Sequence, residues 1–236
     1  MIMKHLRKFE TDADVQDWQM SEDHVKPNVV LVGDTRSVLY NVKALSGVMI
    51  HHIDGSLYTT DEWTAGGFAN SEANGVAVID DRASFVLPKT QLGNKKWSSE
   101  LTTIENIVTS TNKEIAKEDY NGRSNTEQIS SQLADSLASS CINFVFPNGE
   151  HGYLPALGEL LVMRDYISTI NEVLSLVGGT LIKIDEYSSY WSSTQGSMYS
   201  AWVVYMGKEL YTDTRKSYTY QGYNNYYAIA FGSLNI

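Results

Sequence analysis

The sequence GYLPALGEL occupies residues 152–160 and separates two parts of the chain that have different patterns. Before it, the run NFVFPNGEHGYLP (143–155) indicates a short strand followed by turns, because apolar residues give way to Pro, Asn and Gly. After it, apolar residues recur with the helical period over 157–177, and Gly178-Gly179 ends that helix. No helix signal follows from Leu181 onward, so strands and loops are expected to fill the rest of the sequence.

A second helix is expected on the other side of this stretch, over residues 125–140. Ser124 and Glu127 stand at the spacing of a capping box, which begins helices. Apolar residues then follow at four-residue steps and form one helical face. They are Ile129, Leu133 and Leu137.

Strand pairs are expected between residues 47 and 89. The run GVMIHHIDGSLYTTDEW (47–63) places two apolar segments around Asp54-Gly55, a dipeptide that accepts positive φ in a tight hairpin. The run GVAVIDDRASFVLPK (75–89) has the same form. Together with the two helices, these segments predict an α+β domain.

Residues 1–45 are expected to form a small separate module, followed by a domain over 46–236. Thr11 and Asp14 have capping-box spacing within TDADVQDWQM (11–20), which predicts a short helix. The runs NVVLVGD (28–34) and SVLYNV (37–42) then indicate two strands around a turn.

Composition disfavours several classes of protein. Acidic residues outnumber basic ones by 28 to 18, giving a net charge of −10, so a phosphate-binding face is not expected and nucleic acid is not a predicted partner. No apolar run approaches the length of a membrane span, so no membrane insertion is expected. The basic residues of MIMKHLRK (1–8) precede no apolar run, so no signal peptide is visible and synthesis in a cytoplasm is expected.

The sequence carries no specific catalytic or metal-binding motif. Cys141 is the only cysteine, so no intrachain disulfide is expected, and its apolar neighbours favour a buried, unreactive thiol. His51 and His52 are adjacent on a predicted strand and therefore point to opposite faces, so they cannot share one site. The acid pairs Asp80-Asp81 and Asp185-Glu186 are interpreted as solvated loop residues. We therefore expect no enzyme activity, metal or cofactor.

Tyrosine is concentrated near the carboxyl end: ten of the 15 tyrosines lie between residues 187 and 227. A tyrosine offers a large rigid face and one hydroxyl, while Ser, Gly and Asn supply adaptable hydrogen bonds, a composition typical of binding loops. Some of these residues, such as Tyr190-Trp191 and Ala201-Trp202, are expected to pack in a β core. The alternative, a purely structural tyrosine cluster, is disfavoured because strand alternation cannot bury residues 223–226 together.

An exposed aromatic and polar surface is therefore expected. The predicted ligand-binding residues are Tyr199, Tyr205, Tyr211, Asp213, Tyr218, Tyr220, Tyr223, Asn224, Asn225 and Tyr226.

Several stretches, in order, resemble one group of proteins. GYLPALGEL resembles the G-x-R-L-P-T-x-x-E-W segment of C-type lectin folds that are similar to the formylglycine-generating enzyme. Core and closing strands of that fold are matched by YWSST (190–194), AWVV (201–204) and YAIAF (227–231). With DGSLYTTDEWTAGGFANSEANGVAVI (54–79), the chain resembles the variable ligand-binding proteins that retroelements diversify in prophages of gut Bacteroides-type bacteria. The opening residues resemble an N-terminal module of structural proteins in the same phages.

The resemblance implies a fixed backbone on which side chains vary near the carboxyl end. In that family the varied codons start as Asn codons with randomised adenines, and such codons cannot reach Lys, Glu, Gln, Met or Trp. Between 195 and 227 the resemblance thus implies that eight positions are fixed: Gln195, Met198, Trp202, Met206, Lys208, Glu209, Lys216 and Gln221.

The chain also departs from the family pattern. Tyr153, Leu160 and Ile229 stand where the family often has Arg, Trp and Arg. The catalytic branch uses a pair of cysteines, which a single Cys141 cannot supply. The calcium-dependent sugar-binding branch uses a Glu-Pro-Asn loop in its second half, and no proline follows Pro155, so calcium is not expected.

The resemblance implies a C-type lectin fold with two helices packed on short antiparallel sheets, in which the 47–53 strand lies near the closing 227–234 strand. It implies a non-catalytic receptor-binding protein of a phage tail or virion surface, with a host-surface protein or glycan as ligand. The N-terminal module would attach to a larger particle, and a homotrimer is one arrangement that suits this. Two alternatives stay open: a bacterial cell-surface adhesin or lectin, and an enzyme of the formylglycine-generating type.

Overall fold

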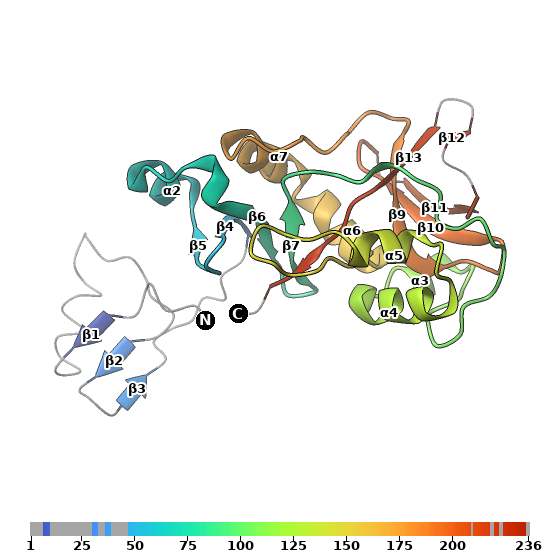
Figure 1. Cartoon of the computed structure of the whole chain (residues 1–236), viewed down its shortest axis with the longest axis horizontal. Helices are drawn as coiled ribbons and strands as arrows, with labels where there is room; N and C mark the ends of the chain where they lie inside the picture. Colours follow the sequence, from blue (N-terminus) through green and yellow to red (C-terminus); the bar gives the residue numbers. More distant parts are fainter. Residues whose placement is uncertain are drawn as a thin grey trace. The chain divides into compact units, whose positions relative to one another are not determined.

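A computed structural model describes the backbone of residues 7–9, 30–32, 36–38, 47–208, 210–217, 220–221 and 224–234. The chain divides into two compact units, Met1–Ser46 together with Ile236, and Gly47–Asn235. Figure 1 traces the elements of each unit along the chain. The role of the first unit in attachment to a particle stays a prediction.

The first unit contains a three-stranded sheet. Strands β1 (Arg7–Phe9) and β2 (Val30–Val32) are parallel, and β2 pairs antiparallel with β3 (Arg36–Val38). The expected strand pair around a turn is thus confirmed at β2 and β3. The helix expected over 11–20 lies outside the described residues.

The second unit begins with a five-stranded antiparallel sheet in the order β14-β7-β6-β4-β5. Both expected hairpins are confirmed, and Gly55 has a φ of 87° in the turn between β4 and β5. The strand bounds are β4 Gly47–His52, β5 Leu57–Tyr58, β6 Ala73–Ile79, β7 Ser84–Pro88 and β14 Gly232–Ser233.

The expectation that the 47–53 strand lies near the closing 227–234 strand is wrong. The closing strand β14 pairs with β7, and both β6 and β7 lie between it and β4. The reason is that both edges of β4 are already occupied, one by β6 and the other by its hairpin partner β5.

A second, mixed sheet holds the tyrosine-rich part of the chain. Its order is β11-β10-β9-β13-β12, with β8 also paired to β13; β9 and β13 are parallel and the other pairs antiparallel. Its strands are β8 Gly93–Asn94, β9 Ser188–Gln195, β10 Ser200–Tyr205, β11 Leu210–Arg215, β12 Tyr220–Gln221 and β13 Asn224–Ala228.

Helices cover both sheets, and the second unit therefore has an α+β architecture. Before the middle of the chain come α2 Thr60–Gly66, the 3-10 turn η1 Asn70–Glu72 and α3 Lys113–Ala116. The remaining helices are α4 Gly122–Gln132, α5 Leu137–Ile142, α6 Leu157–Asp165 and α7 Ile167–Leu176.

The helix expected over 125–140 is two helices. The capping box expected at Ser124 and Glu127 is wrong, because α4 already begins at Gly122 and both residues lie inside it. Leu133 adopts an extended conformation, and the Ser136 side chain then caps α5 by accepting from the Ser139 N–H. Local capping therefore ends one helix and begins another.

The helix expected over 157–177 is also two helices, divided at Tyr166. Its end is as expected, since Gly178 has a φ of 69° and the Gly179 N–H donates to the Leu174 carbonyl at 2.7 Å. A tertiary contact lies at the division: the Tyr166 hydroxyl donates to Asp80 Oδ2 at 3.0 Å, in the turn between β6 and β7.

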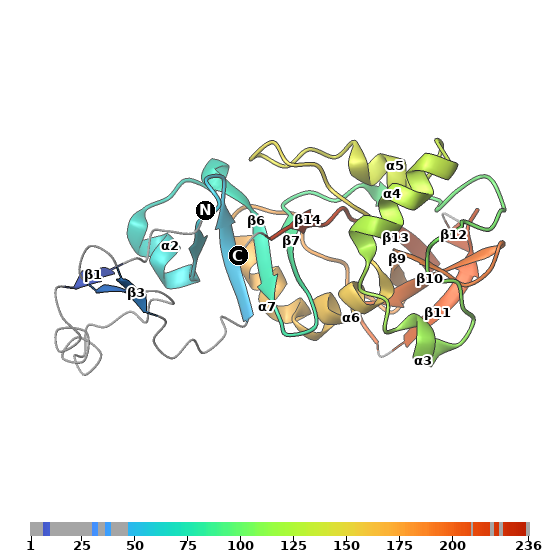
Figure 2. The same ribbon diagram turned by 90° about the horizontal axis from the view of Figure 1, so that it is seen from below.

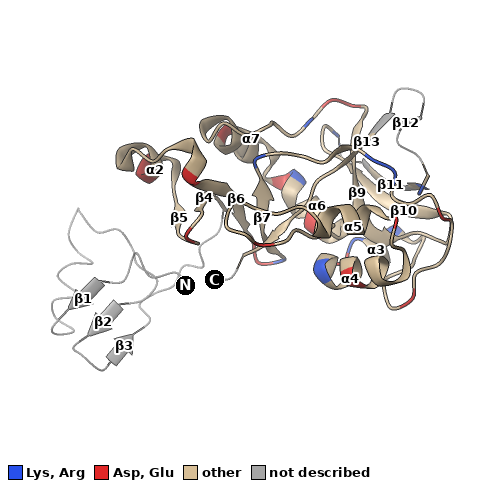
Figure 3. Cartoon of the chain, viewed as in Figure 1, with Lys and Arg blue, Asp and Glu red and all other residues tan. Residues whose placement is uncertain are grey.

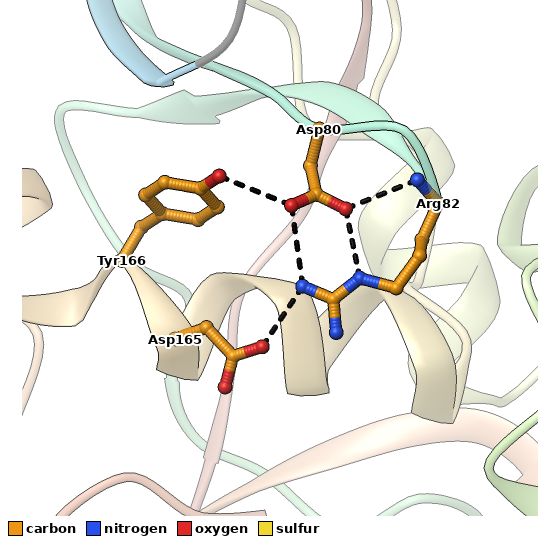
Figure 4. A network of polar contacts seen from close by, with 4 residues as sticks. All are labelled: Asp80, Arg82, Asp165 and Tyr166. Atoms are coloured by element: carbon orange, nitrogen blue, oxygen red, sulfur yellow. Dashed lines mark hydrogen bonds and ion pairs between the residues drawn. The ribbon is translucent and has the colours of Figure 1, made fainter.

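Asp80 is the centre of a polar network at this corner (Figure 4). Arg82 Nε donates to Asp80 Oδ1 at 2.8 Å and Arg82 Nη2 to Asp80 Oδ2 at 3.2 Å, while Nη2 also donates to Asp165 Oδ2 at 2.9 Å. The hydrogen bonds from Arg82 are the main reason why the pKa of Asp80 falls to about 2. The network joins the β6–β7 turn to the junction of α6 and α7.

The interior of the second unit has two main apolar clusters, on opposite faces of β9 and β10. One lies between the first sheet, α6 and α7, and includes Ile50, Leu160 and Trp202. The other lies against α4 and α5 and includes Ile129 and Trp191. Figure 2 shows α4 and α5 on one side of β9 and β10, and α6 on the other. Both faces of this hairpin are therefore buried.

We predict that Asp80→Asn lowers the free energy of unfolding at pH 7 by about 1 kcal/mol, the upper range for a partly exposed ion pair. Because the folded pKa of Asp80 is lowered, its stabilisation is present above the ordinary value of 3.8 and is lost as the pH falls toward about 2. Chemical unfolding at pH 7 and at pH 3 measures the difference. Asp81→Asn, next to it on an exposed position, is the control and should change neither value.

Candidate ligand-binding surface

The surface expected to bind a ligand is built on strand β9, whose sequence SSYWSSTQ is buried along its whole length. Tyr190 and Trp191 enter the two opposite apolar clusters, as alternation requires. The expected core packing of Tyr190-Trp191 and of Ala201-Trp202 is confirmed, since all four side chains are at most 1% exposed. Because β9 is buried, the hydroxyls of its serine and threonine side chains need hydrogen-bond partners within the protein.

Buried polar groups supply those partners. Ser192 Oγ donates to the Trp202 carbonyl at 2.9 Å, and Thr194 Oγ1 donates to Asp119 Oδ2 at 2.8 Å. Asn125 Nδ2 donates both to the same Asp119 oxygen at 2.8 Å and to Ser193 Oγ at 3.1 Å. These bonds join β9 to β10, to Asp119 and, through Asn125, to α4.

The stretch at residues 152–160 is fixed to the same strand. The Ser193 N–H donates to the Pro155 carbonyl at 2.7 Å, and the Leu157 N–H donates to Thr194 Oγ1 at 2.9 Å. At its other end, Tyr153 and Phe231 exchange two backbone hydrogen bonds of 2.8 Å. The stretch therefore joins β9 to the closing segment of the chain.

Glu159 completes this arrangement as a buried carboxyl. It accepts hydrogen bonds from the Ala156 N–H at 2.7 Å and from the Tyr153 hydroxyl at 3.1 Å. Burial is the main cause that raises the pKa of Glu159 to about 8, and burial also raises the pKa of Tyr153. Both groups are engaged within the core, so we interpret them as structural.

The turn between β9 and β10 displays Tyr199. The Ser197 and Ser200 hydroxyls lie 2.9 Å apart, and Ser197 Oγ accepts from the Tyr199 N–H at 3.1 Å. The Tyr199 carbonyl accepts from the Lys216 N–H at 3.0 Å. The backbone of the turn is thus held, while the Tyr199 side chain is 55% exposed.

Tyr211 lies on the edge strand β11 and is half-buried. The centroid of the Tyr211 ring is 6.0 Å from that of Trp202. The Nζ atom of Lys113, on α3, lies 5.5 Å from the Tyr211 centroid. These contacts with a tryptophan and a cation restrict the orientation of the ring. The ring stays partly accessible. Tyr199 and Tyr211 are therefore the predicted binding tyrosines that the structure shows at least partly accessible.

The expectation of an outward-facing side chain is wrong for Tyr205 and Tyr226. They are 5% and 2% exposed. The Tyr226 ring centroid lies 5.3 Å from that of Trp191, and Lys208 Nζ lies 4.7 Å above the Tyr205 ring. The reason is that helices and loops cover both faces of the second sheet, so that alternation on β10 and β13 brings tyrosines into the second apolar cluster.

The structure does not describe the side chains of the other predicted site residues. Tyr218 and Tyr223 lie outside the described residues, while Asp213, Tyr220, Asn224 and Asn225 are described only as backbone positions in strands β11, β12 and β13. Asp213 pairs with Trp202, and Tyr220 pairs with Asn225. Their part in binding stays a prediction.

Two exposed large hydrophobic side chains near the predicted set were not predicted as site residues. Met198 precedes Tyr199 in the same turn and is 40% exposed, and Tyr187 precedes β9 and is 42% exposed. The Gly and Ser residues around Met198 are a turn signal that would have indicated its exposure.

The two adjacent histidines and the cysteine lie in buried surroundings. His51 Nδ1 lies 2.8 Å from Asn74 Nδ2, whereas the His52 ring packs against Tyr58, Trp63 and Phe68, so the two histidines occupy separate surroundings. Burial lowers the pKa of His51 and raises the pKa of the Cys141 thiol. The expectation of a buried cysteine is confirmed.

Within the described ranges, no group of three or more His, Cys, Asp or Glu side chains is arranged to hold a metal ion. In the view of Figure 3, the Lys and Arg residues of the described chain are dispersed over several elements. None of the helices that the structure describes has the length and apolar character needed to cross a lipid bilayer.

Comparison with known proteins gives no match: no family model, no curated protein and no solved structure matches the chain.

We predict that Tyr226→Ala and Tyr199→Ala have very different effects on stability. Removing the buried Tyr226 ring leaves a cavity beside Trp191, so the free energy of unfolding should fall by about 3–5 kcal/mol. Removing the exposed Tyr199 ring should change it by less than about 0.5 kcal/mol. Urea unfolding of the two variants measures both values, and equal effects would contradict the burial described above.

Proposed function

We propose that the second unit is a C-type lectin fold of the formylglycine-generating-enzyme-like group, and that it binds a ligand without catalysis. The α+β architecture is compatible with this fold. The positions of the resembling stretches support it further: residues 152–160 bridge β9 and Phe231, while 190–194 and 201–204 lie in the paired core strands β9 and β10.

The observation that carries the proposal is the contrast between the buried hairpin and the tyrosines at its margin. All residues of β9 and β10 are buried, yet Tyr199 in their connecting turn is 55% exposed. A rigid tyrosine on a held turn loses little conformational entropy when it binds a partner. This arrangement suits recognition through side chains on a fixed backbone.

The positions that the resemblance implies to be fixed give further support. Eight residues between 195 and 227 cannot arise from randomised Asn codons. Six of these have described side chains, and four of the six are at most 4% exposed, namely Gln195, Trp202, Met206 and Lys216. Buried positions are those where variation would disturb the fold most. A diversified protein needs its invariant residues there.

The ligand that we propose is a protein or glycan on the surface of a host bacterium. The chain would be a variable protein of a retroelement, carried on a phage tail or virion surface through its first unit. Repeated copies on one particle, in a homotrimer or a larger array, would hold a cell through avidity even where each site binds weakly.

Sequencing tests the diversification. We expect a reverse-transcriptase gene beside this gene, together with a near-copy of its 3′ end. Changes between isolates should fall at positions that are adenine in the near-copy, in codons such as those for Tyr199 and Tyr211. The codons of Gln195 and Trp202 should not vary. Uniform variation across the gene, with no such neighbour, would contradict the proposal.

Binding to cells tests recognition. Fluorescently labelled protein is added to whole cells of a panel of gut Bacteroides-type strains, and binding is measured by flow cytometry. On a strain that binds, the double variant Tyr199→Ala, Tyr211→Ala should bind at least about tenfold more weakly, as for loss of central contact residues.

Tyr187→Ala is the matched control for this experiment, because Tyr187 is exposed to a similar extent but precedes β9. It should bind like the unaltered protein. The double variant should keep its melting temperature within a few degrees. Unchanged binding by a well-folded double variant would overturn the assignment of these two tyrosines.

A further inference from the structure

Lys216 is a buried cation between β11 and β12. Its side chain is 0% exposed, which is uncommon for a lysine, and no acidic side chain that the structure describes forms an ion pair with it. Lys216 Nζ donates to the Thr102 carbonyl at 2.7 Å and to Gln195 Oε1 at 2.5 Å. It also lies 4.5 Å from the centroid of the Trp97 ring. Two oxygens and one aromatic ring thus surround the ammonium group in place of water.

The Lys216 backbone makes contacts with the same region. Its carbonyl accepts hydrogen bonds from the Trp97 N–H at 2.8 Å and from the Ser98 N–H at 3.2 Å. Its own N–H donates to the Tyr199 carbonyl at 3.0 Å. A single residue is therefore bonded to the loop at 97–102 and to the turn that displays Tyr199.

Gln195 extends these contacts to a further loop. Its Oε1 accepts from the Ile104 N–H at 3.1 Å in addition to Lys216, and its Nε2 donates to Thr109 Oγ1 at 2.8 Å. The Gln195 carbonyl accepts from the Ser110 N–H at 2.9 Å. Lys216 and Gln195 together hold loop 97–110 against the end of β9.

Burying an ammonium group costs free energy unless hydrogen bonds replace its water. Burial lowers the pKa of Lys216 to about 8, and no described charged group is near enough to shift that pKa further. A methionine would fill a similar volume without this cost. The charge is therefore explained better by the contacts that it makes than by packing.

We propose that Lys216 is a positioning residue for the candidate ligand-binding surface: its buried ammonium holds loop 97–110 and the end of β9 together, and its backbone N–H holds the Tyr199 turn to the same place. The ligand-binding role of that surface rests on the function proposed above. The positioning role does not, since it concerns the free protein.

The experiment compares the full chain with Lys216→Met and with the matched control Lys208→Met. Lys208 also lies over an aromatic ring, at 4.7 Å from that of Tyr205, but its side chain is exposed. Amide hydrogen exchange is measured by NMR without any ligand. Exchange protection at Trp97, Ser98, Ile104, Ser110 and Lys216 should fall at least about tenfold in Lys216→Met, as expected for local opening.

Protection in strand β6, at Val76 and Val78, should change less than about twofold in Lys216→Met, and Lys208→Met should leave all of these amides unchanged. Unchanged protection at loop 97–110 in Lys216→Met would overturn the proposal. An equal loss in β6 would also overturn it, because the residue would then support the whole fold and not this surface.

A titration of the unaltered protein avoids any variant that fails to fold. The indole N–H signal of Trp97, whose Nε1 donates to the Ser192 carbonyl at 2.9 Å, should shift with a midpoint near pH 8 as Lys216 loses its proton. The same step should be present in Lys208→Met and absent in Lys216→Met. A Trp97 signal that does not titrate would show that the ammonium is not coupled to this ring.

The proposed function and the positioning role of Lys216 can be refuted independently of each other. If cells are not bound but Lys216→Met loosens loop 97–110 alone, the function is wrong and the positioning role stands. If cells are bound and loop 97–110 keeps its protection in Lys216→Met, the positioning role is wrong and the function stands.

Discussion

The burial of a strand made mostly of polar residues constrains the whole second unit. Strand β9 places serine, threonine and glutamine side chains away from water, and a buried hydroxyl without a partner costs on the order of 1–3 kcal/mol. Asp119, Asn125 and the segment at 152–160 must therefore approach it in defined positions. Apolar contacts are not directional, whereas the hydrogen bonds of β9 restrict the positions of the segments packed against it.

This constraint also determines where a contact surface can lie. Because both faces of β9 and β10 are covered, their side chains cannot reach a partner, whereas the connecting turn and the edge strand β11 carry accessible tyrosines. The tyrosines consequently have two roles. Tyr190 and Tyr226 fill the interior, while Tyr199 and Tyr211 face outward at least in part.

Short-range features of the fold could be predicted from the sequence, and tertiary ones could not. The hairpin at Asp54-Gly55 and the helix end at Gly178-Gly179 follow from backbone preferences of single residues. The start of α4 does not, because its buried face includes Gly122, Asn125 and Thr126, whose polar or small side chains hide the helical pattern. The contact of Tyr166, at the division between α6 and α7, with Asp80 could not be predicted either, because the two residues are far apart in the sequence.

The candidate surface was predicted by composition, which identifies a tyrosine-rich segment but not the orientation of each ring. In the sequence, Tyr205 and Tyr226 do not differ from the neighbouring tyrosines, and helices and loops elsewhere in the chain bury them.

The pairing of β14 with β7 affects how the chain folds during synthesis on the ribosome. The first sheet lacks its outer strand, and Tyr153 lacks its partner Phe231, until the last strands emerge. Until then one edge of β7 has no strand partner, and an unpaired strand edge is where partly folded chains associate with one another.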